Sequence, residues 1–143
     1  MKTLTAANSV ILLSVVGLFD IPVQLQGFSA DNVYDTDDVT PTETAMGVDG
    51  KLSAGFVPVA VRQGFTLQAD SDSVEIFERW YQAQQAAREV YFAQGSTYLP
   101  SVQRKYAARR GVLQGYSPLP PAQKVLQPRK FSILWEAVSG AAI

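Results

Sequence analysis

Four aspartates within the stretch DNVYDTDD have side chains that could together bind a metal ion. They are Asp31, Asp35, Asp37 and Asp38. Carboxylate oxygens are typical Ca²⁺ ligands, but the stretch lacks the glycine and the distal glutamate of an EF-hand loop. We therefore interpret it as a solvated or partner-facing acidic loop, and the sequence predicts no metal ion and no cofactor.

Histidine and cysteine are both absent from the 143 residues. A Ser-His-Asp triad, a Cys-His pair, a histidine-ligated zinc and a disulfide framework are therefore excluded. These absences remove the commonest catalytic side chains but do not by themselves exclude an enzyme. The sequence offers no candidate catalytic residues, and we expect a protein that is not an enzyme.

Opposite charges are concentrated in opposite halves of the chain, although the net charge is only −1. Residues 1–70 hold eight acidic and three basic side chains, whereas residues 101–143 hold one acidic and seven basic ones. The seven basic residues are Arg104, Lys105, Arg109, Arg110, Lys124, Arg129 and Lys130. Such a split is compatible with a nucleic-acid patch, with ordinary solvated charges, or with one face of the molecule meeting the opposite face of another copy.

The apolar run SVILLSVVGLF, residues 9–19, is a candidate export signal, membrane anchor or core strand. It is shorter than the roughly 20 residues that a transmembrane helix needs, and no small-residue cleavage site follows it. Its β-branched residues and the neighbouring Gly17 and Pro22 favour a buried strand. We expect no signal and no membrane contact, and a mature protein that begins at or next to Met1.

The following segments alternate between strand patterns and a polar insertion. Residues 22–28 and 56–69 show the two-residue alternation of strands, the second with a shift near Gly64 that suggests a bulge or a bend. Between them, residues 29–50 are too polar for a core and end in GVDG, a signal for a tight hairpin turn. We predict an extended acidic loop at about residues 29–50, formed as a long loop or as a hairpin tip.

A helix is predicted after Asp72, because no glycine or proline interrupts residues 73–94. Asp72 and Glu75 have the spacing of a capping box. Apolar residues recur at helical spacing and are expected to form a packing face against a sheet. This face consists of Ile76, Phe77, Trp80, Ala83, Ala87 and Val90.

Two further strand regions, residues 101–118 and 122–138, surround the stiff connector SPLPPA. In the second region Phe131, Ile133 and Trp135 alternate with polar or smaller residues. No repeat or linker divides the chain, so residues 1–143 are predicted to form a single domain. The predicted fold is α+β, with six or seven mostly antiparallel strands in a β-barrel or sandwich and one long helix packed on its outside.

This order of elements resembles the tail tube proteins of long-tailed bacteriophages, which are related to secretion-system tube proteins. The resemblance covers roughly residues 8–140. Its most specific part is TETAMGVDGKLSAGF, followed by the strand FVPVAVRQGFTLQADS directly before the helix and by the closing segment PRKFSILWEAVSG.

The resemblance implies a structural virion protein of the tail, assembled in the host cytoplasm. Six copies would form a ring whose strands join into an inner barrel, and stacked rings would make the hollow tube for genome delivery. The implied partners are further copies of the chain, tape measure, tail terminator and baseplate proteins, a sheath if the tail is contractile, and DNA in transit through the lumen. Residues 9–19 would then be a strand that completes its hydrogen bonding only between copies.

Two other functions stay open: another tail or baseplate structural protein, and a soluble barrel that binds a small ligand. For a stack of rings, the charge split leads to the hypothesis that the acidic loop of one ring meets the basic strand region of the next. The residues of this hypothetical inter-ring contact are Asp35, Asp37, Asp38, Arg104, Lys105, Arg109 and Arg110.

Overall fold

The computed structural model describes residues 3–143, so Met1, where the mature protein is predicted to begin, lies outside the described residues. The strands are β1 (Val10–Val15), β2 (Phe19–Gln24), β3 (Tyr34–Thr36), β4 (Thr42–Met46), β5 (Leu52–Phe56), β6 (Val61–Leu67), β7 (Ala93–Leu99), β8 (Arg104–Tyr116) and β9 (Arg129–Ala142). The helices are α1 (Val74–Ala87) and the short 3₁₀ helix η1 (Pro100–Val102). All these strands pair in antiparallel fashion, which confirms the predicted α+β class.

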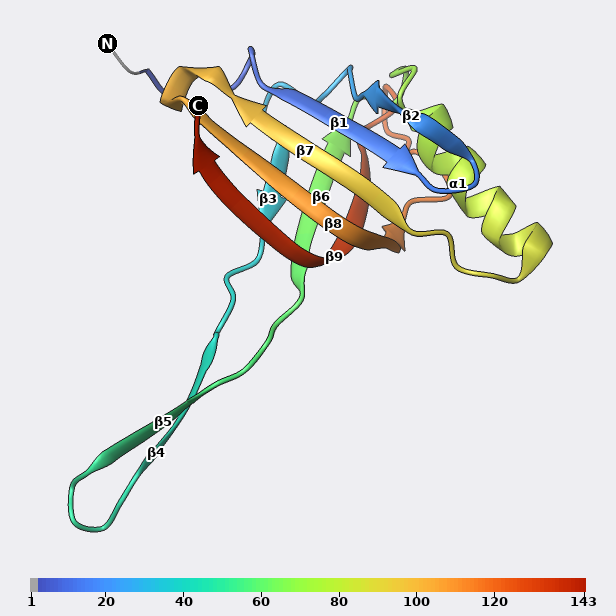
Figure 1. Cartoon of the computed structure of the whole chain (residues 1–143). Coiled ribbons are helices and arrows are strands. Elements are labelled where there is room, and N and C mark those ends of the chain that lie inside the picture. The colour runs from blue at the N-terminus through green and yellow to red at the C-terminus, as the bar shows by residue number, and fades with distance from the viewer. Residues whose placement is uncertain (1–2) are drawn as a thin grey trace.

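Seven of the strands form one sheet in the order β2-β1-β7-β8-β9-β6-β3, and β4 and β5 form a separate hairpin (Figure 1). The long strands β8 and β9 pair along most of their length. The first half of β8 also pairs with β7, whereas the first half of β9 pairs with β6. The sheet folds over where β8 stops pairing with β7 and β9 stops pairing with β6. In this region Arg110 has a φ of +49°. Two layers result, which is the sandwich form of the predicted architecture.

Trp135 occupies the centre of the space between the two layers. Its side chain is 1% exposed, and its Nε1 donates a hydrogen bond to Oε1 of Gln63 at 3.1 Å. Nε2 of Gln63 in turn donates to the hydroxyl of Thr97 at 3.4 Å. Gln63 lies on β6 and Thr97 on β7, which are not neighbours in the sheet. This hydrogen-bonded chain therefore joins the two layers through the interior.

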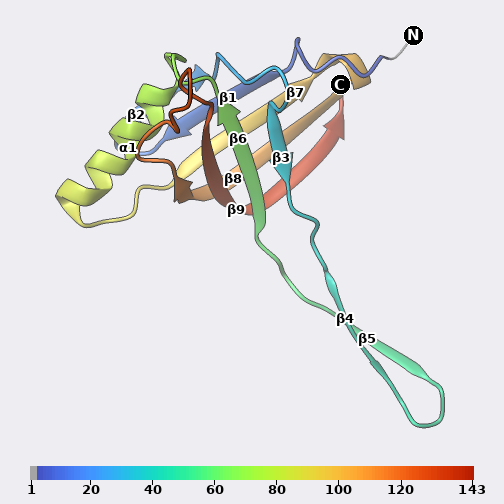
Figure 2. The same ribbon diagram turned by 180° about the vertical axis from the view of Figure 1, so that it is seen from behind.

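Helix α1 lies across one end of the folded sheet (Figures 1 and 2). It buries Val74, Phe77 and Trp80 against the strands. The ring of Phe77 stacks on Phe131 of β9 with 4.5 Å between centroids. Nε1 of Trp80 donates to the carbonyl of Tyr91 at 3.1 Å. The first half of α1 thus closes one end of the core with aromatic side chains.

The predicted packing face of the helix is only partly correct. Phe77 and Trp80 are buried, as predicted, and Val74 is buried in addition. The helix ends earlier than the sequence suggested, because Arg88 adopts the left-handed conformation with a φ of +53°. The fully buried residues all lie in its first half, and in the second half Tyr81 stacks on Tyr116 of β8. The other predicted members are half-buried or exposed: Ile76, Ala83, Ala87 and Val90.

The predicted capping box does not form. Ser73, and not Asp72, is the N-cap residue, and no side chain caps the helix. The Ser73 hydroxyl instead accepts a hydrogen bond from the backbone N–H of Gln26 at 2.7 Å. The start of α1 is thus held by the segment that follows β2.

The N-terminal run 9–19 is not one strand. Residues 10–15 form β1, and a turn with Gly17 at a φ of +88° leads into β2. β1 is paired with β2 on one side and with β7 on the other. The expectation that this segment completes its hydrogen bonds only between copies is therefore wrong. No helix among residues 3–143 is long and apolar enough to cross a membrane.

Residues 29–50 contain an edge strand and half of a hairpin where one acidic loop was predicted. Residues 34–36 form β3, which pairs with β6. The predicted hairpin turn is confirmed, since the N–H of Gly47 donates to the carbonyl of Lys51 at 2.8 Å and Gly50 has a φ of +84°. Of the two alternatives near Gly64, the bulge is wrong, because β6 keeps a regular register with both of its neighbours.

Candidate functional site

The β4–β5 arm, defined as residues 38–60, has one apolar face that is open to solvent. It projects away from the rest of the molecule (Figures 1 and 2). Alternate residues of a strand lie on the same face, so the cross-strand pairs Thr42–Phe56, Thr44–Ala54 and Met46–Leu52 share one face of the arm. The exposed fractions are 66% for Met46, 58% for Leu52 and 80% for Phe56.

A second apolar surface lies where the two layers of the sheet separate. β6 pairs with β9 only as far as Trp135, and beyond this residue the layers diverge. The opening between them, which we call the mouth, has a volume of about 350 Å³. Its wall is mainly aliphatic and aromatic. The lining residues are Tyr34, Thr36, Val61, Gln63, Thr97, Leu99, Tyr106, Ala108 and Val138.

Several strand edges have no partner within residues 3–143, and three of them belong to β2, β3 and β9 of the seven-stranded sheet. β2 and β3 are the outer strands of the seven-stranded sheet. The third edge runs from Glu136 to Ala142 in β9, where only β8 is paired with it. Unpaired strand edges present rows of backbone N–H and C=O groups, which can pair with another chain. The third edge also borders the mouth through Val138.

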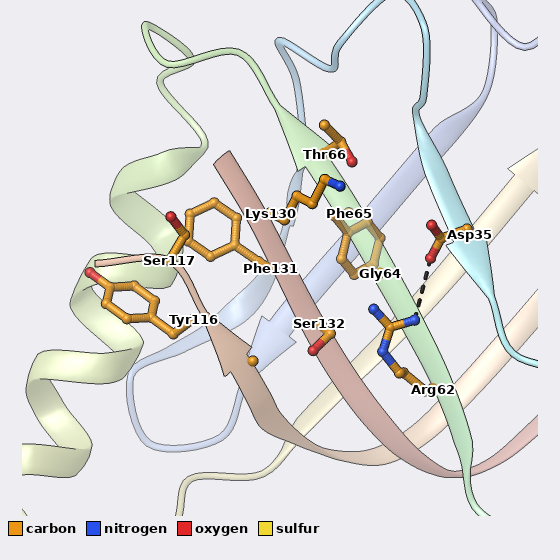
Figure 3. Close-up of a pocket in the computed structure, with 11 residues that line it drawn as sticks. Asp35, Arg62, Gly64, Phe65, Thr66, Tyr116, Ser117, Lys130, Phe131 and Ser132 are labelled. Atoms are coloured by element: carbon orange, nitrogen blue, oxygen red, sulfur yellow. Dashed lines mark hydrogen bonds and ion pairs between the residues drawn. The ribbon is translucent and has the colours of Figure 1, made fainter. Parts of the chain in front are cut away.

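A shallow depression of about 320 Å³ lies on β6 and β9 beside β3 (Figure 3). Its charged residues are Asp35, Arg62 and Lys130, and the remaining lining residues are glycine, aromatic or hydroxyl-bearing. Asp35 and Arg62 point toward each other at 3.4 Å (Figure 3). Both side chains are partly exposed, so this pair contributes about 0–1 kcal/mol to stability. It holds the edge strand β3 against β6.

The residues of the hypothetical inter-ring contact fall into three groups. Asp35 and Asp37 both face Arg62, at 3.4 and 3.3 Å. Arg109 and Arg110 both face Glu136, at 3.7 and 3.8 Å. The remaining members take part in none of the ion pairs of residues 3–143: Asp38, Arg104 and Lys105. The structure does not bring the acidic and the basic members together within one chain.

Two polar side chains near these surfaces lie in unusual surroundings, Arg129 buried and Tyr34 half-buried. Arg129 is 4% exposed, and its guanidinium donates to Glu78 of α1 at 2.8 Å and to the carbonyl of Ser117 at 2.5 Å. It thus ties α1 to the connector before β9. At the mouth, burial and the nearby Tyr106 raise the pKa of the Tyr34 hydroxyl. Among residues 3–143, no three acidic side chains gather so that they could hold a metal ion.

Sequence reasoning missed both apolar surfaces. For the arm a signal was present, because Met46, Leu52 and Phe56 stand at strand spacing on either side of the GVDG turn. The acidic composition of residues 29–50 led instead to the prediction of an acidic loop. For the mouth there was no local signal, because its wall comes from five separate strands.

The sequence as a whole was then compared with known proteins. A family model described as tail fiber protein gp32 matches residues 2–139. The chain belongs to this family. No curated protein matches the sequence. Family membership makes the chain a structural protein of the phage-tail type, and the family description names no enzymatic activity.

Several solved structures share the fold over nearly the whole chain. A structure described as the sheath/tube terminator of PVC, an extracellular contractile injection system, aligns with a TM-score of 0.68 at 10% identity over 99% of both chains. The tube terminating cap of the anti-feeding prophage aligns with a TM-score of 0.57 at 10% identity, over 93% of this chain and 88% of that one. The six-fold symmetrised baseplate structure of the anti-feeding prophage gives 0.55 at 8% identity, over 99% and 98%. These matches confirm the predicted fold class.

Proposed function

We propose that the chain is a structural protein of a virion tail that joins copies of itself into hexameric rings, which stack into the hollow tube for genome delivery. The proposal is supported by membership in the tail fiber protein gp32 family and by a fold shared with a sheath/tube terminator over 99% of both chains. The six-fold symmetry in the description of one matching structure supports the number of copies.

The observation that carries the proposal is the pair of free edges of the seven-stranded sheet, β2 and β3. The two edges differ in length and sequence, so a contact between β2 of one copy and a different surface of the next is heterologous. Heterologous contacts close into a ring when the rotation between copies allows it, and otherwise continue as a filament. Such a molecule needs no catalytic group.

The proposed partners are further copies of the chain, tape measure, tail terminator and baseplate proteins, and a sheath if the tail is contractile. DNA passes through the lumen without being a stable ligand. The matching structures are described as parts of sheath-tube complexes, terminators and a baseplate, which supports this set of partners. We place the protein in the virion tail, assembled in the host cytoplasm.

A second candidate function is a single ring that ends the tube. It is favoured by the TM-scores, because the structures described as a terminator and as a terminating cap give 0.68 and 0.57, whereas a sheath-tube complex gives 0.55. A terminator ring differs from a tube ring in that it does not stack on further copies of itself.

Negative-stain electron microscopy of the purified chain separates these functions. Tubes of many stacked rings support the tube subunit, and isolated rings that do not lengthen with protein concentration support the terminator. A protein that stays monomeric at every concentration contradicts both.

We further propose that rings meet through opposite charges: Asp35, Asp37 and Asp38 on one ring, and Arg104, Lys105, Arg109 and Arg110 on the next. The three members without an ionic partner in the described chain are the most available for such a contact. Each exposed pair contributes only about 0–1 kcal/mol, but a six-fold ring repeats every pair six times.

A further inference from the structure

We infer that the apolar face of the β4–β5 arm docks into the mouth of another copy of the same chain. The inference rests on the proposed function and deepens it, because it names the two surfaces by which copies join.

The arm lacks the packing that would make it stable by itself. A two-stranded hairpin alone is marginally stable in water, and stability requires further strands or packing on a hydrophobic face. All ten residues of β4 and β5 are exposed. The apolar side chains Met46, Leu52 and Phe56 are therefore available to a partner.

The direction of the arm makes that partner a different molecule. The arm begins beside Thr36 and ends beside Val61, and both of these residues line the mouth of its own chain. An extended strand rises about 3.3 Å per residue, so residues 37–47 reach roughly 35 Å. Figures 1 and 2 show the tip far from its own sheet. Because the arm starts beside the mouth of its own chain and extends away from it, its tip can reach the mouth of a neighbouring copy.

The mouth offers both an apolar wall and a strand edge to this arm. Val138 faces the mouth, and the edge of β9 from Glu136 to Ala142 has its backbone groups unpaired on the side away from β8. A strand added at this edge directs every second side chain into the mouth. The apolar residues of β5 have that spacing at Leu52, Ala54 and Phe56.

The arm is acidic, and an arginine lies beside the uncharged lining of the mouth. Residues 38–60 contain Asp38, Glu43 and Asp49 against Lys51, a net charge of −2. Arg104 lies 5.9 Å from the ring of Tyr106, which lines the mouth. Arg104 has no carboxylate partner in the ion pairs of residues 3–143. This complementarity favours a copy of the chain as the occupant of the mouth.

The apolar face is tested by Leu52→Asp, with Ser53→Asp as the matched control. Both residues are exposed and lie on the same strand, but Ser53 is on the opposite face of the arm. We expect Leu52→Asp to abolish the assemblies that electron microscopy detects and Ser53→Asp to leave them intact. Both variants are expected to unfold like the wild type, because the arm contributes nothing to the core.

The docking site is tested by cross-linking, since the chain has no natural cysteine. Leu52→Cys in one copy and Val138→Cys in a second copy of different mass are mixed and treated with a short thiol cross-linker. The control replaces Val138→Cys by Ser139→Cys, one residue along β9 and on the other face of the sheet. We expect a severalfold higher yield of the mixed dimer with Val138→Cys.

The outcomes separate this inference from the proposed function. If the wild type assembles but Leu52→Asp also assembles, or if Val138→Cys and Ser139→Cys give equal yields of mixed dimer, docking of the arm in the mouth is refuted and ring formation stands. If the wild type does not assemble at all, the proposed function itself fails.

Discussion

Single residues determine how closely the two layers of the sheet approach each other. Gly95 and Gly111 face the indole of Trp135 from β7 and β8, and a Cβ at Gly111 would lie 2.4 Å from an indole carbon. A side chain at this position must displace either the indole or a backbone. The packing around Trp135 thus depends on two residues that have no side chain to contribute.

The first prediction concerns this close approach. Gly111→Ala is expected to lower the free energy of unfolding by about 1–3 kcal/mol, the usual cost of overpacking a core. Gly55→Ala is the control, because a Cβ at Gly55 has nothing within 4 Å, and we expect a change within about 0.5 kcal/mol. Urea denaturation of both variants measures the difference. Equal stability of the two would show that the indole moves aside freely.

The second prediction concerns the Tyr34 hydroxyl at the mouth, whose pKa is raised by burial and by Tyr106. A tyrosine in the unfolded chain ionises near pH 10, so above that pH the unfolded state loses its proton before the folded state does. The free energy of unfolding should therefore fall as the pH rises above about 10 and be unaffected by this group below it. Tyr34→Phe should show a smaller fall in urea denaturation on either side of that pH. An identical fall in both proteins would rule out a contribution from Tyr34.

At the scale of elements, helix α1 shows where sequence periodicity is reliable. Its existence and the burial of Phe77 and Trp80 followed from the sequence, because the spacing of large apolar residues is a local property. The position of its end did not, since it depends on the left-handed conformation of Arg88 and on the bend of the chain toward β7. Residues 73–94 contain no glycine or proline, so the sequence did not indicate where the helix ends.

The third prediction tests the corrected packing face of α1. Trp80→Ala should cost about 3–5 kcal/mol, because the indole is fully buried and its Nε1 is hydrogen-bonded. Val90→Ala, at a position 56% exposed, should change stability by less than about 0.5 kcal/mol. Thermal and urea unfolding of both variants decide between the packing face of the structure and the longer one predicted from the sequence. A large loss of stability in Val90→Ala would contradict this prediction and support the longer helix predicted from the sequence.

The strands were predictable to different degrees. The alternation of Phe131, Ile133 and Trp135 correctly predicted the buried face of β9, and GVDG correctly predicted the hairpin turn. β3 was missed, because three residues among aspartates become a strand only through pairing with the distant β6. The fold of the sheet at Arg110 was also not predicted, because β8 stops pairing with β7 there without any break in its sequence pattern.

At the scale of the whole molecule, the sequence pattern led to the tube-like fold, but the surfaces proposed to join copies needed the structure. The predicted charge contact was based on the concentration of acidic and basic residues in opposite halves of the chain. The structure adds that Arg62 and Glu136 already pair with four of the seven charged residues. The mouth and the apolar face of the arm appear only when distant strands are brought together.

The fourth prediction concerns the charges that have no partner. Asp38→Lys is expected to weaken stacking of rings while the isolated chain unfolds like the wild type, and Arg104→Glu together with Lys105→Glu in the same chain should partly restore it. Stacking should also weaken at high salt, because the screening length falls from about 10 Å at 0.1 M to about 3 Å at 1 M. Sedimentation of assemblies measures both effects. Normal stacking of Asp38→Lys at every salt concentration would leave apolar contacts as the whole cause of stacking.

The central claim of this account is that the chain forms closed six-copy rings by itself. Native mass spectrometry of the purified wild-type chain at low salt tests it most directly. We predict a dominant species of about 94 kDa, six times the 15.6 kDa mass of one chain, together with its multiples if rings stack. A spectrum that contains only the 15.6 kDa chain at every protein concentration, or an assembly whose mass is not a multiple of six chains, would contradict it.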